Sequence, residues 1–274
     1  VLHQRQVLEI YKLKSVAYVY EIMKPIKRNA LFSTIAFGAT ITVNALANIL
    51  PINGLNTGEV SALYPSLFTP AGITFSIWSV IYLLLLGYVI LQWLKSDAYV
   101  FAETAKLFWL SCLLNCCWIV AWHYLKVSIS VTLMLLLLLT LAQLFLKVRK
   151  ISMNSAAEKI FVRLPFTIYF AWICVATIAN ISALLVSIGW PALNIAPATW
   201  TIVMMTIAAL LGIFVTTKYR VAPFAIVIAW ALFGIYIKWS GTVNEIIAYA
   251  ALVLLIITAG AAFNTWRRLR FAVL

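Results

Sequence analysis

Eight stretches of this chain are long, apolar and free of charged residues at their centres. Most of them reach the ~20 residues that a helix needs to cross the hydrocarbon core of a bilayer. The sequence therefore predicts an all-α fold, a polytopic integral membrane bundle of eight transmembrane helices. The predicted spans are roughly 30–49, 73–94, 104–124, 128–147, 163–186, 200–217, 222–237 and 243–264.

The basic residues lie on alternate sides of these spans. The net charge is +13, and with a cytoplasmic N-terminus 18 of the 20 Lys and Arg residues fall in inner segments. The outer segments hold only Lys126 and Lys238. This is the positive-inside distribution, and it predicts that both termini are cytoplasmic. The positive charge is thus a topology signal, with anionic lipid as a further contact, and we expect no nucleic-acid partner.

Three segments follow from this topology. Residues 1–28 form a charged cytoplasmic segment that is either an interfacial helix or a disordered tail. Residues 29–187 hold the first five spans. Residues 188–274 hold the last three, after an outer loop at 187–199. We expect the membrane to be the bacterial inner membrane, with an organellar or photosynthetic membrane as the alternative.

The outer loop at 50–72 is the longest between spans, and it is unusually apolar. It contains Pro51, Pro65 and Pro70, which end helices and set turns, and its one charged residue is Glu59. A loop of this composition is expected to fold over the end of the bundle as a lid. The alternative is a loop that rests on lipid headgroups.

Polar residues within the spans form a pattern. Thr40, Asn44 and Asn48 share one face of the first span, Asn115 lies in the middle of the third, and Asn180 lies in the fifth. An amide is costly in hydrocarbon unless it is hydrogen-bonded, so such residues face other helices. We expect the first, third and fifth spans to surround a partly polar interior.

The chain has eleven Trp residues. Those at span ends, Trp200, Trp239 and Trp266, are explained by the preference of Trp for membrane interfaces. Trp78, Trp118 and Trp172 lie deeper. Aromatic walls with a few amide or hydroxyl groups suit a flat, apolar ligand.

Chemistry-bearing clusters are missing from the sequence. No Asp, Glu, Lys or Arg lies mid-membrane, where ion-coupled transporters carry such groups. The four Cys residues have no metal-ligand spacing and are expected to be free thiols. We predict no metal site and no catalytic residues; whether the protein is an enzyme is left open, with a non-enzyme favoured. His123 is interpreted either as an axial ligand to a tetrapyrrole metal or as a residue bonded to a loop carbonyl.

Three motifs resemble a known family. They are PSLFTPAGITFSIWSVIY at 65–82, LLNCCWIVAW at 113–122 and WICVATIAN at 172–180. In order and spacing they are similar to motifs of the tryptophan-rich sensory protein family, also called the translocator or peripheral benzodiazepine receptor family. The resemblance covers roughly 30–187. Ala71 stands where the family often has a second Pro, and Pro165 stands seven residues before Trp172 rather than four.

The resemblance implies a five-helix pocket under the outer loop that binds porphyrins, haem-related pigments, or sterol-like or drug-like molecules. Carried over by motif, the implied ligand-binding residues are Phe75, Trp78, Tyr82, Asn115, Trp118, Trp122, Trp172 and Ala176. A porphyrin, haem or other tetrapyrrole is the implied cofactor, if there is one. Family membership also implies a role in stress response.

Three functions remain open at this stage. The first is binding of an apolar planar ligand by a sensor, scavenger or carrier. The second is an accessory subunit of a larger membrane complex, with or without pigment, or a homo-oligomer. Either would dock through the last three spans, where Ala208 and Gly212 have small-xxx-small spacing. The third is a transporter of an uncharged solute.

Overall fold

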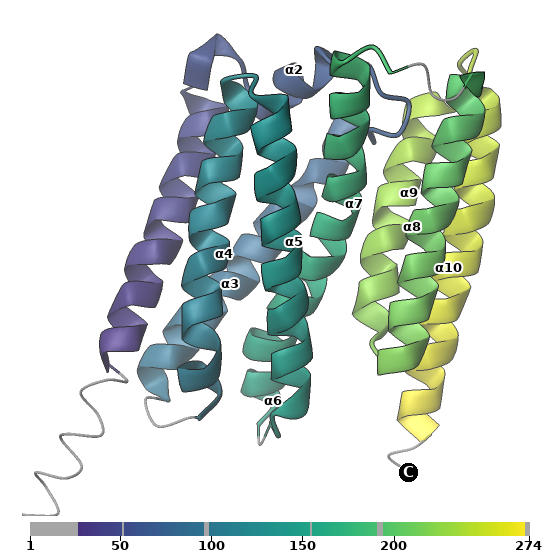
Figure 1. The fold of residues 1–274 in the computed structure, drawn as a ribbon. Coiled ribbons are helices and arrows are strands. Elements are labelled where there is room, and N and C mark those ends of the chain that lie inside the picture. Colours follow the sequence, from purple (N-terminus) through teal and green to yellow (C-terminus); the bar gives the residue numbers. More distant parts are fainter. Residues whose placement is uncertain (1–26, 51, 96–98, 154, 191–193, 272–274) are drawn as a thin grey trace, which may run out of the picture.

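The computed structural model describes residues 27–50, 52–95, 99–153, 155–190 and 194–271 (Figure 1). Within them, eight helices are long and apolar enough to cross a membrane, so the predicted fold class is confirmed. The proposed interfacial helix of 1–28 lies outside the described residues, apart from its last two positions. The long helices are the first helix (Lys27–Ile49), α3 (Ile77–Leu94), α4 (Tyr99–His123), α5 (Val127–Lys150), α7 (Leu164–Ser187), α8 (Pro197–Tyr219), α9 (Ala222–Trp239) and α10 (Glu245–Phe271).

Five shorter elements join the long helices. They are η1 (Ile52–Gly54) and α2 (Thr57–Ala62) in the outer loop, η2 (Gly72–Ser76) before α3, and α6 with η3 (Ala156–Glu158 and Lys159–Arg163) before α7. Figure 1 shows the long helices side by side, with the start of the first helix and the end of α10 at the same end of the molecule. That end is the inner end of the predicted topology, and α2 lies at the opposite, outer end.

Local sequence signals explain where several helices begin and end. The Asn56 side chain accepts from the N–H groups of Gly58 and Glu59, and Glu59 bonds back to the Asn56 N–H, which is a capping box for α2. Proline occupies the first turn of α7, α8 and α9, where its missing N–H costs nothing. A single π turn, η3, precedes Pro165 and carries the chain into α7.

Charged residues are paired at the inner end. Lys95 Nζ lies 2.7 Å from Glu158 Oε1, and Lys147 Nζ lies 2.8 Å from Glu103 Oε2. The guanidinium of Arg149 donates to the Tyr219 carbonyl, which connects α5 to α8. These contacts close the inner end of the bundle.

The last three helices pack against each other, and α9 makes most of their contact with α7. A Cβ added at Gly212 would lie 2.9 Å from Ile228 Cγ1, so α8 and α9 approach closely there. Ala208 is buried as well. The small-residue stripe predicted as a docking face is therefore used within the chain.

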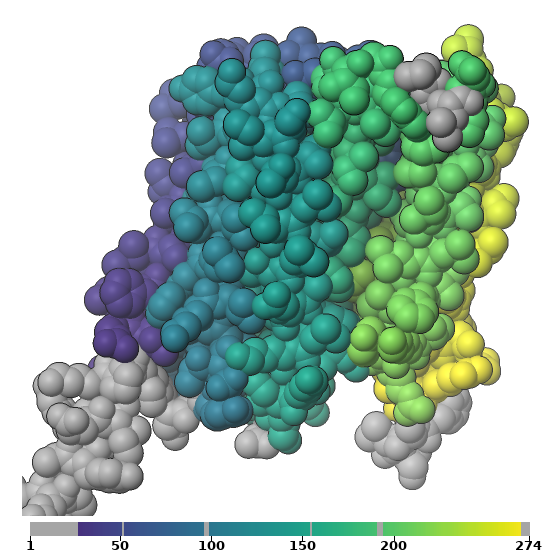
Figure 2. All heavy atoms as spheres, viewed as in Figure 1, coloured from purple at the N-terminus to yellow at the C-terminus, as the bar shows by residue number. Residues whose placement is uncertain are grey.

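The outward faces of the bundle are apolar. Leu139, Leu210 and Val253 are among the large side chains that are exposed. Figure 2 shows that side chains fill most of the space between the ribbons on the face in view. This surface matches a lipid environment, and the polar contacts of the molecule lie in its interior and at its two ends.

Candidate functional site: a cavity under the outer loop

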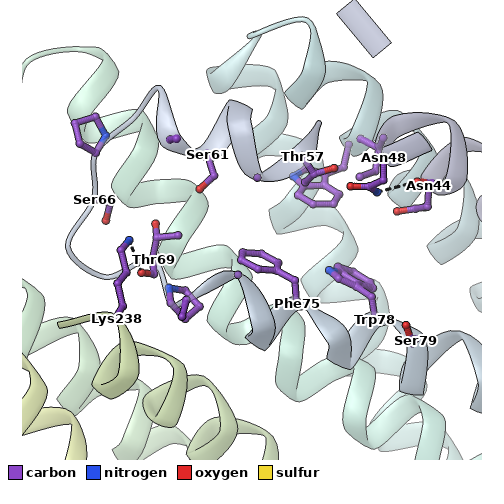
Figure 3. A pocket seen from close by; sticks show the side chains of 18 of the residues that line it. Asn44, Asn48, Thr57, Ser61, Ser66, Thr69, Phe75, Trp78, Ser79 and Lys238 are labelled. Atoms are coloured by element: carbon purple, nitrogen blue, oxygen red, sulfur yellow. Dashed lines mark hydrogen bonds between the residues drawn. The ribbon is translucent and has the colours of Figure 1, made fainter. Parts of the chain in front are cut away.

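A cavity of about 1000 Å³ lies beneath the outer loop. Figure 3 shows α2 on one side of it and η2 with the start of α3 on the other, with Phe75 and Trp78 directed between them. The first helix, α4 and the end of α9 complete the wall. The residues that line the cavity include Asn44, Ala45, Asn48, Thr57, Ser61, Phe75, Trp78, Ser79, Tyr82, Trp118, Lys238 and Trp239.

A second cavity, of about 60 Å³, adjoins the first. It shares Phe75, Trp78 and Trp118 with the large cavity. Its own wall adds Trp122 and Trp172, together with Ala176 and Asn180. The two spaces form one continuous region with an aromatic wall between α3, α4 and α7.

Trp78 is the centre of this aromatic wall. Its ring is stacked with Tyr82, with centroids 5.5 Å apart, and with Trp118 at 6.3 Å. The edges of Tyr169 and Trp172 meet it at 5.7 and 6.3 Å. Such ring pairs are favourable beyond the area they bury, so the wall is rigid and presents broad apolar faces.

Polar atoms in this wall have no partner. Among the described residues, the Tyr82 hydroxyl and the indole N–H groups of Trp118 and Trp172 are buried without a hydrogen bond. A buried donor of this kind costs about 1–3 kcal/mol unless something bonds to it. All three residues line one of the two cavities, but the three polar atoms themselves are covered by neighbouring side chains, so an acceptor atom would reach them only if a side chain moved.

The predicted polar interior is confirmed. Asn44 Nδ2 donates to Asn115 Oδ1 at 2.8 Å, and Asn115 Nδ2 donates to the Tyr169 hydroxyl at 3.1 Å. This chain of hydrogen bonds joins the first helix, α4 and α7, which are the first, third and fifth spans. Asn180 accepts from Ser130 Oγ at 3.1 Å and joins α5 to α7.

The outer loop is attached to α4 at its beginning. His123 is fully buried; its Nδ1 donates to the Ile52 carbonyl at 3.2 Å, and its Nε2 lies 3.1 Å from Thr57 Oγ1. Asn53 Nδ2 donates to the His123 carbonyl, and Trp122 Nε1 donates to the Thr57 carbonyl. Both ring nitrogens of His123 therefore contact the outer loop, as in the loop-bonded interpretation, and its role as an axial ligand stays a prediction.

The same loop is attached to α9 at its end. The indole N–H groups of Trp230 and Trp239 donate to the carbonyls of Thr74 and Leu67, at 2.9 and 2.8 Å. Lys238 Nζ donates to the Thr69 carbonyl at 2.8 Å. The Ala71 N–H donates to the Gly234 carbonyl at 3.0 Å. The loop thus covers the cavity as the lid interpretation predicts, and α9 holds one side of it.

The ligand-binding residues that the motifs predict fall into three groups in the structure. Phe75, Trp78, Tyr82 and Trp118 line the large cavity. Trp122, Trp172 and Ala176 line the small one. Asn115 lines neither cavity and bonds to Asn44 and Tyr169 behind the wall.

Several wall residues were not nominated from the sequence. Lys238 and Trp239 belong to the last three helices, which the motifs do not reach, and Trp239 has a specific contact beyond its interfacial position. Asn44 and Asn48 were marked only as a polar stripe. Thr57 and Ser61 lie in the loop. Two features of the sequence point to these residues: the apolar composition of the outer loop and the isolated basic residue Lys238 on the outer side.

Together, the fold and the cavity define a polytopic helical membrane protein with an aromatic-lined cavity beneath its outer loop. The model of the family described as TSPO-like protein matches residues 30–264, and the chain belongs to this family. The match extends beyond the predicted 30–187 and takes in most of the last three helices. No curated protein and no solved structure is significantly similar to the chain.

Proposed function

We propose that this protein binds an apolar, planar molecule in the cavity beneath the outer loop. The class includes porphyrins and other tetrapyrroles, and sterol-like lipids. The observation that carries the proposal is the cavity of about 1000 Å³, with the stacked rings of Trp78, Tyr82 and Trp118 in its wall. Membership of the TSPO-like family supports a membrane ligand-binding role.

The dimensions and chemistry of the site support this class of ligand. About 1000 Å³ is at the upper end of the range for small-molecule pockets. The faces of Trp78 and Phe75 offer stacking surface. The lining also contains polar side chains that can make directional contacts to ring nitrogens or carbonyl oxygens, among them Asn48, Thr57 and Ser61. The site lies at the outer end of the bundle, so the ligand would enter from the outer leaflet or the outer aqueous phase.

A role as sensor, scavenger or carrier is consistent with this arrangement. Neither cavity is lined by an acidic residue or a histidine, so the wall residues supply stacking and hydrogen bonds rather than general acid–base chemistry. We therefore propose binding, and not a hydrolytic or proton-transfer reaction, as the activity.

The test is a titration of the purified protein with protoporphyrin IX and with a fluorescent sterol. We expect at least one to bind saturably and to quench Trp fluorescence. The double variant Trp78→Phe, Trp172→Phe should lower the affinity about tenfold, because ring area is lost from the walls of both cavities. Trp200→Phe, which removes a Trp that packs on Trp190 away from the cavity, is the matched control.

Two results would contradict the proposal. One is that neither probe binds saturably to the folded protein. The other is that the double variant and the Trp200→Phe control bind with the affinity of the unmodified chain. The affinities are read from the fluorescence anisotropy of the probe, which does not depend on the number of Trp residues.

A further inference from the structure

The large cavity has one charged lining residue, and it comes from α9. Lys238 is half-buried, and its stem packs at the edge of the cavity, with Nζ lying 5.1 Å from the centroid of the Trp239 ring. Figure 3 shows the side chain reaching from α9 towards Thr69 in the outer loop. A cation is therefore placed at the edge of an otherwise uncharged, aromatic space.

No carboxylate neutralises this cation among the described residues. The two salt bridges there, Lys95–Glu158 and Lys147–Glu103, lie at the inner end. Glu59, the acidic residue of the outer loop, is exposed and caps α2 through Asn56. Half-buried charges usually have a partner of opposite sign, because removing them from water is costly.

The hydrogen bonding of Lys238 is also incomplete. Its ammonium group has three N–H donors, and the described bond is the one to the Thr69 carbonyl, at 2.8 Å. This bond directs Nζ to the rim formed by Thr69, Pro70 and Ala71, all of which line the cavity. Two donors remain for an anionic oxygen.

We infer that Lys238 makes the cavity selective for ligands that carry an anionic oxygen group, a carboxylate or a phosphate ester, at one end of an apolar body. The inference rests on the proposed function and adds the chemical class of the ligand's polar end. The apolar body would lie against Phe75 and Trp78, and the anionic group would lie at Lys238 beneath the loop. The selectivity arises from α9 rather than from the five-helix core.

The experiment compares protoporphyrin IX with its dimethyl ester, which has the same ring but no carboxylate. The unmodified chain should bind the diacid roughly tenfold more tightly, the effect expected of one charge-assisted hydrogen bond at a partly exposed site. Lys238→Met should abolish this preference by weakening binding of the diacid alone. Lys238→Arg should keep it.

Lys126→Met is the matched control, since it removes the same charge from the same face at a residue that does not line the cavity. Equal binding of the two porphyrins by the unmodified chain, or a preference that survives Lys238→Met, would overturn the inference while leaving the proposed function intact. Failure of both porphyrins to bind would overturn the proposed function, and the inference with it.

A second arm separates the two sources of the anionic group. The titration is repeated in phosphatidylcholine bilayers with and without phosphatidylglycerol. If the preference for the diacid is the same in both, the anionic group belongs to the ligand. If phosphatidylglycerol reduces the preference in the unmodified chain but not the ester affinity, a lipid phosphate also reaches Lys238, which supports the anion site.

Discussion

At the scale of single residues, the site contains amide groups that are hydrogen-bonded to other helices and indole groups that have no hydrogen bond. The Asn115 side-chain amide accepts a hydrogen bond from Asn44 and donates one to the Tyr169 hydroxyl, and both partners belong to other helices. The indoles of Trp118 and Trp172, by contrast, have no partner among the described residues. Burying an unbonded donor is unfavourable in a membrane interior. The bonded groups therefore hold the wall in place, and the two unbonded indole N–H groups lie covered within it.

Replacing Asn115 should destabilise the bundle. Asn115→Ala removes two interhelical hydrogen bonds, to Asn44 and to Tyr169. Asn44 keeps its bond to the Thr40 carbonyl, and we expect the free energy of unfolding to fall by about 1–2 kcal/mol. Denaturant-induced unfolding in micelles, followed by circular dichroism, measures the change. Asn48→Ala is the control, because Asn48 is exposed and bonds within its own helix. Equal losses for the two variants would argue against the network.

At the scale of elements, α9 is the unexpected contributor. It lies between the five-helix group and the other two late helices, and it bonds to four backbone positions of the outer loop and η2. A Cβ added at Gly234 would lie 1.9 Å from Thr74 Oγ1 and 2.9 Å from Pro70 Cβ. The loop therefore approaches the α9 backbone so closely that only glycine fits.

This contact predicts the effect of Gly234→Ala. The added methyl group should force η2 and the loop away from α9, at a cost of about 1–3 kcal/mol in stability, and should weaken ligand binding by loosening the cover of the cavity. Thermal unfolding and the porphyrin titration measure the two effects. Gly260→Ala on α10, where a Cβ would meet no atom within 4 Å, should be neutral or slightly stabilising. Unchanged binding by Gly234→Ala would show that the lid does not depend on α9.

At the scale of the whole molecule, the chain is a five-helix group joined to three further helices through a shared lid. The outer loop is bonded to α4 at one end and to α9 at the other, and the cavity lies between these attachments. The family match, which continues to residue 264, is consistent with the last three helices being part of the conserved unit of this family.

The number of helices could be predicted from the sequence because hydrocarbon burial demands long uncharged stretches. The boundaries could be predicted less well: α4 begins at Tyr99 and α10 ends at Phe271, beyond the predicted 104 and 264, because a helix continues past the hydrocarbon into charged sequence. The deep residues Trp78, Trp118 and Trp172 were predicted by motif and position. Trp239 could not be placed, because a Trp at a span end has the same pattern whether it faces lipid or a neighbouring loop. The contact between α9 and the loop joins positions about 170 residues apart, and no periodicity reports such a pairing.

The central claim is that the cavity beneath the lid is the binding site, and filling it tests this most directly. Ala45→Phe places an aromatic ring in the cavity from the first helix, whereas Ala39→Phe adds the same ring to an exposed position of that helix. In a titration with the probe that binds the unmodified chain, we predict one saturable site that Ala45→Phe abolishes and Ala39→Phe retains. Equal saturable binding by all three proteins would contradict the account.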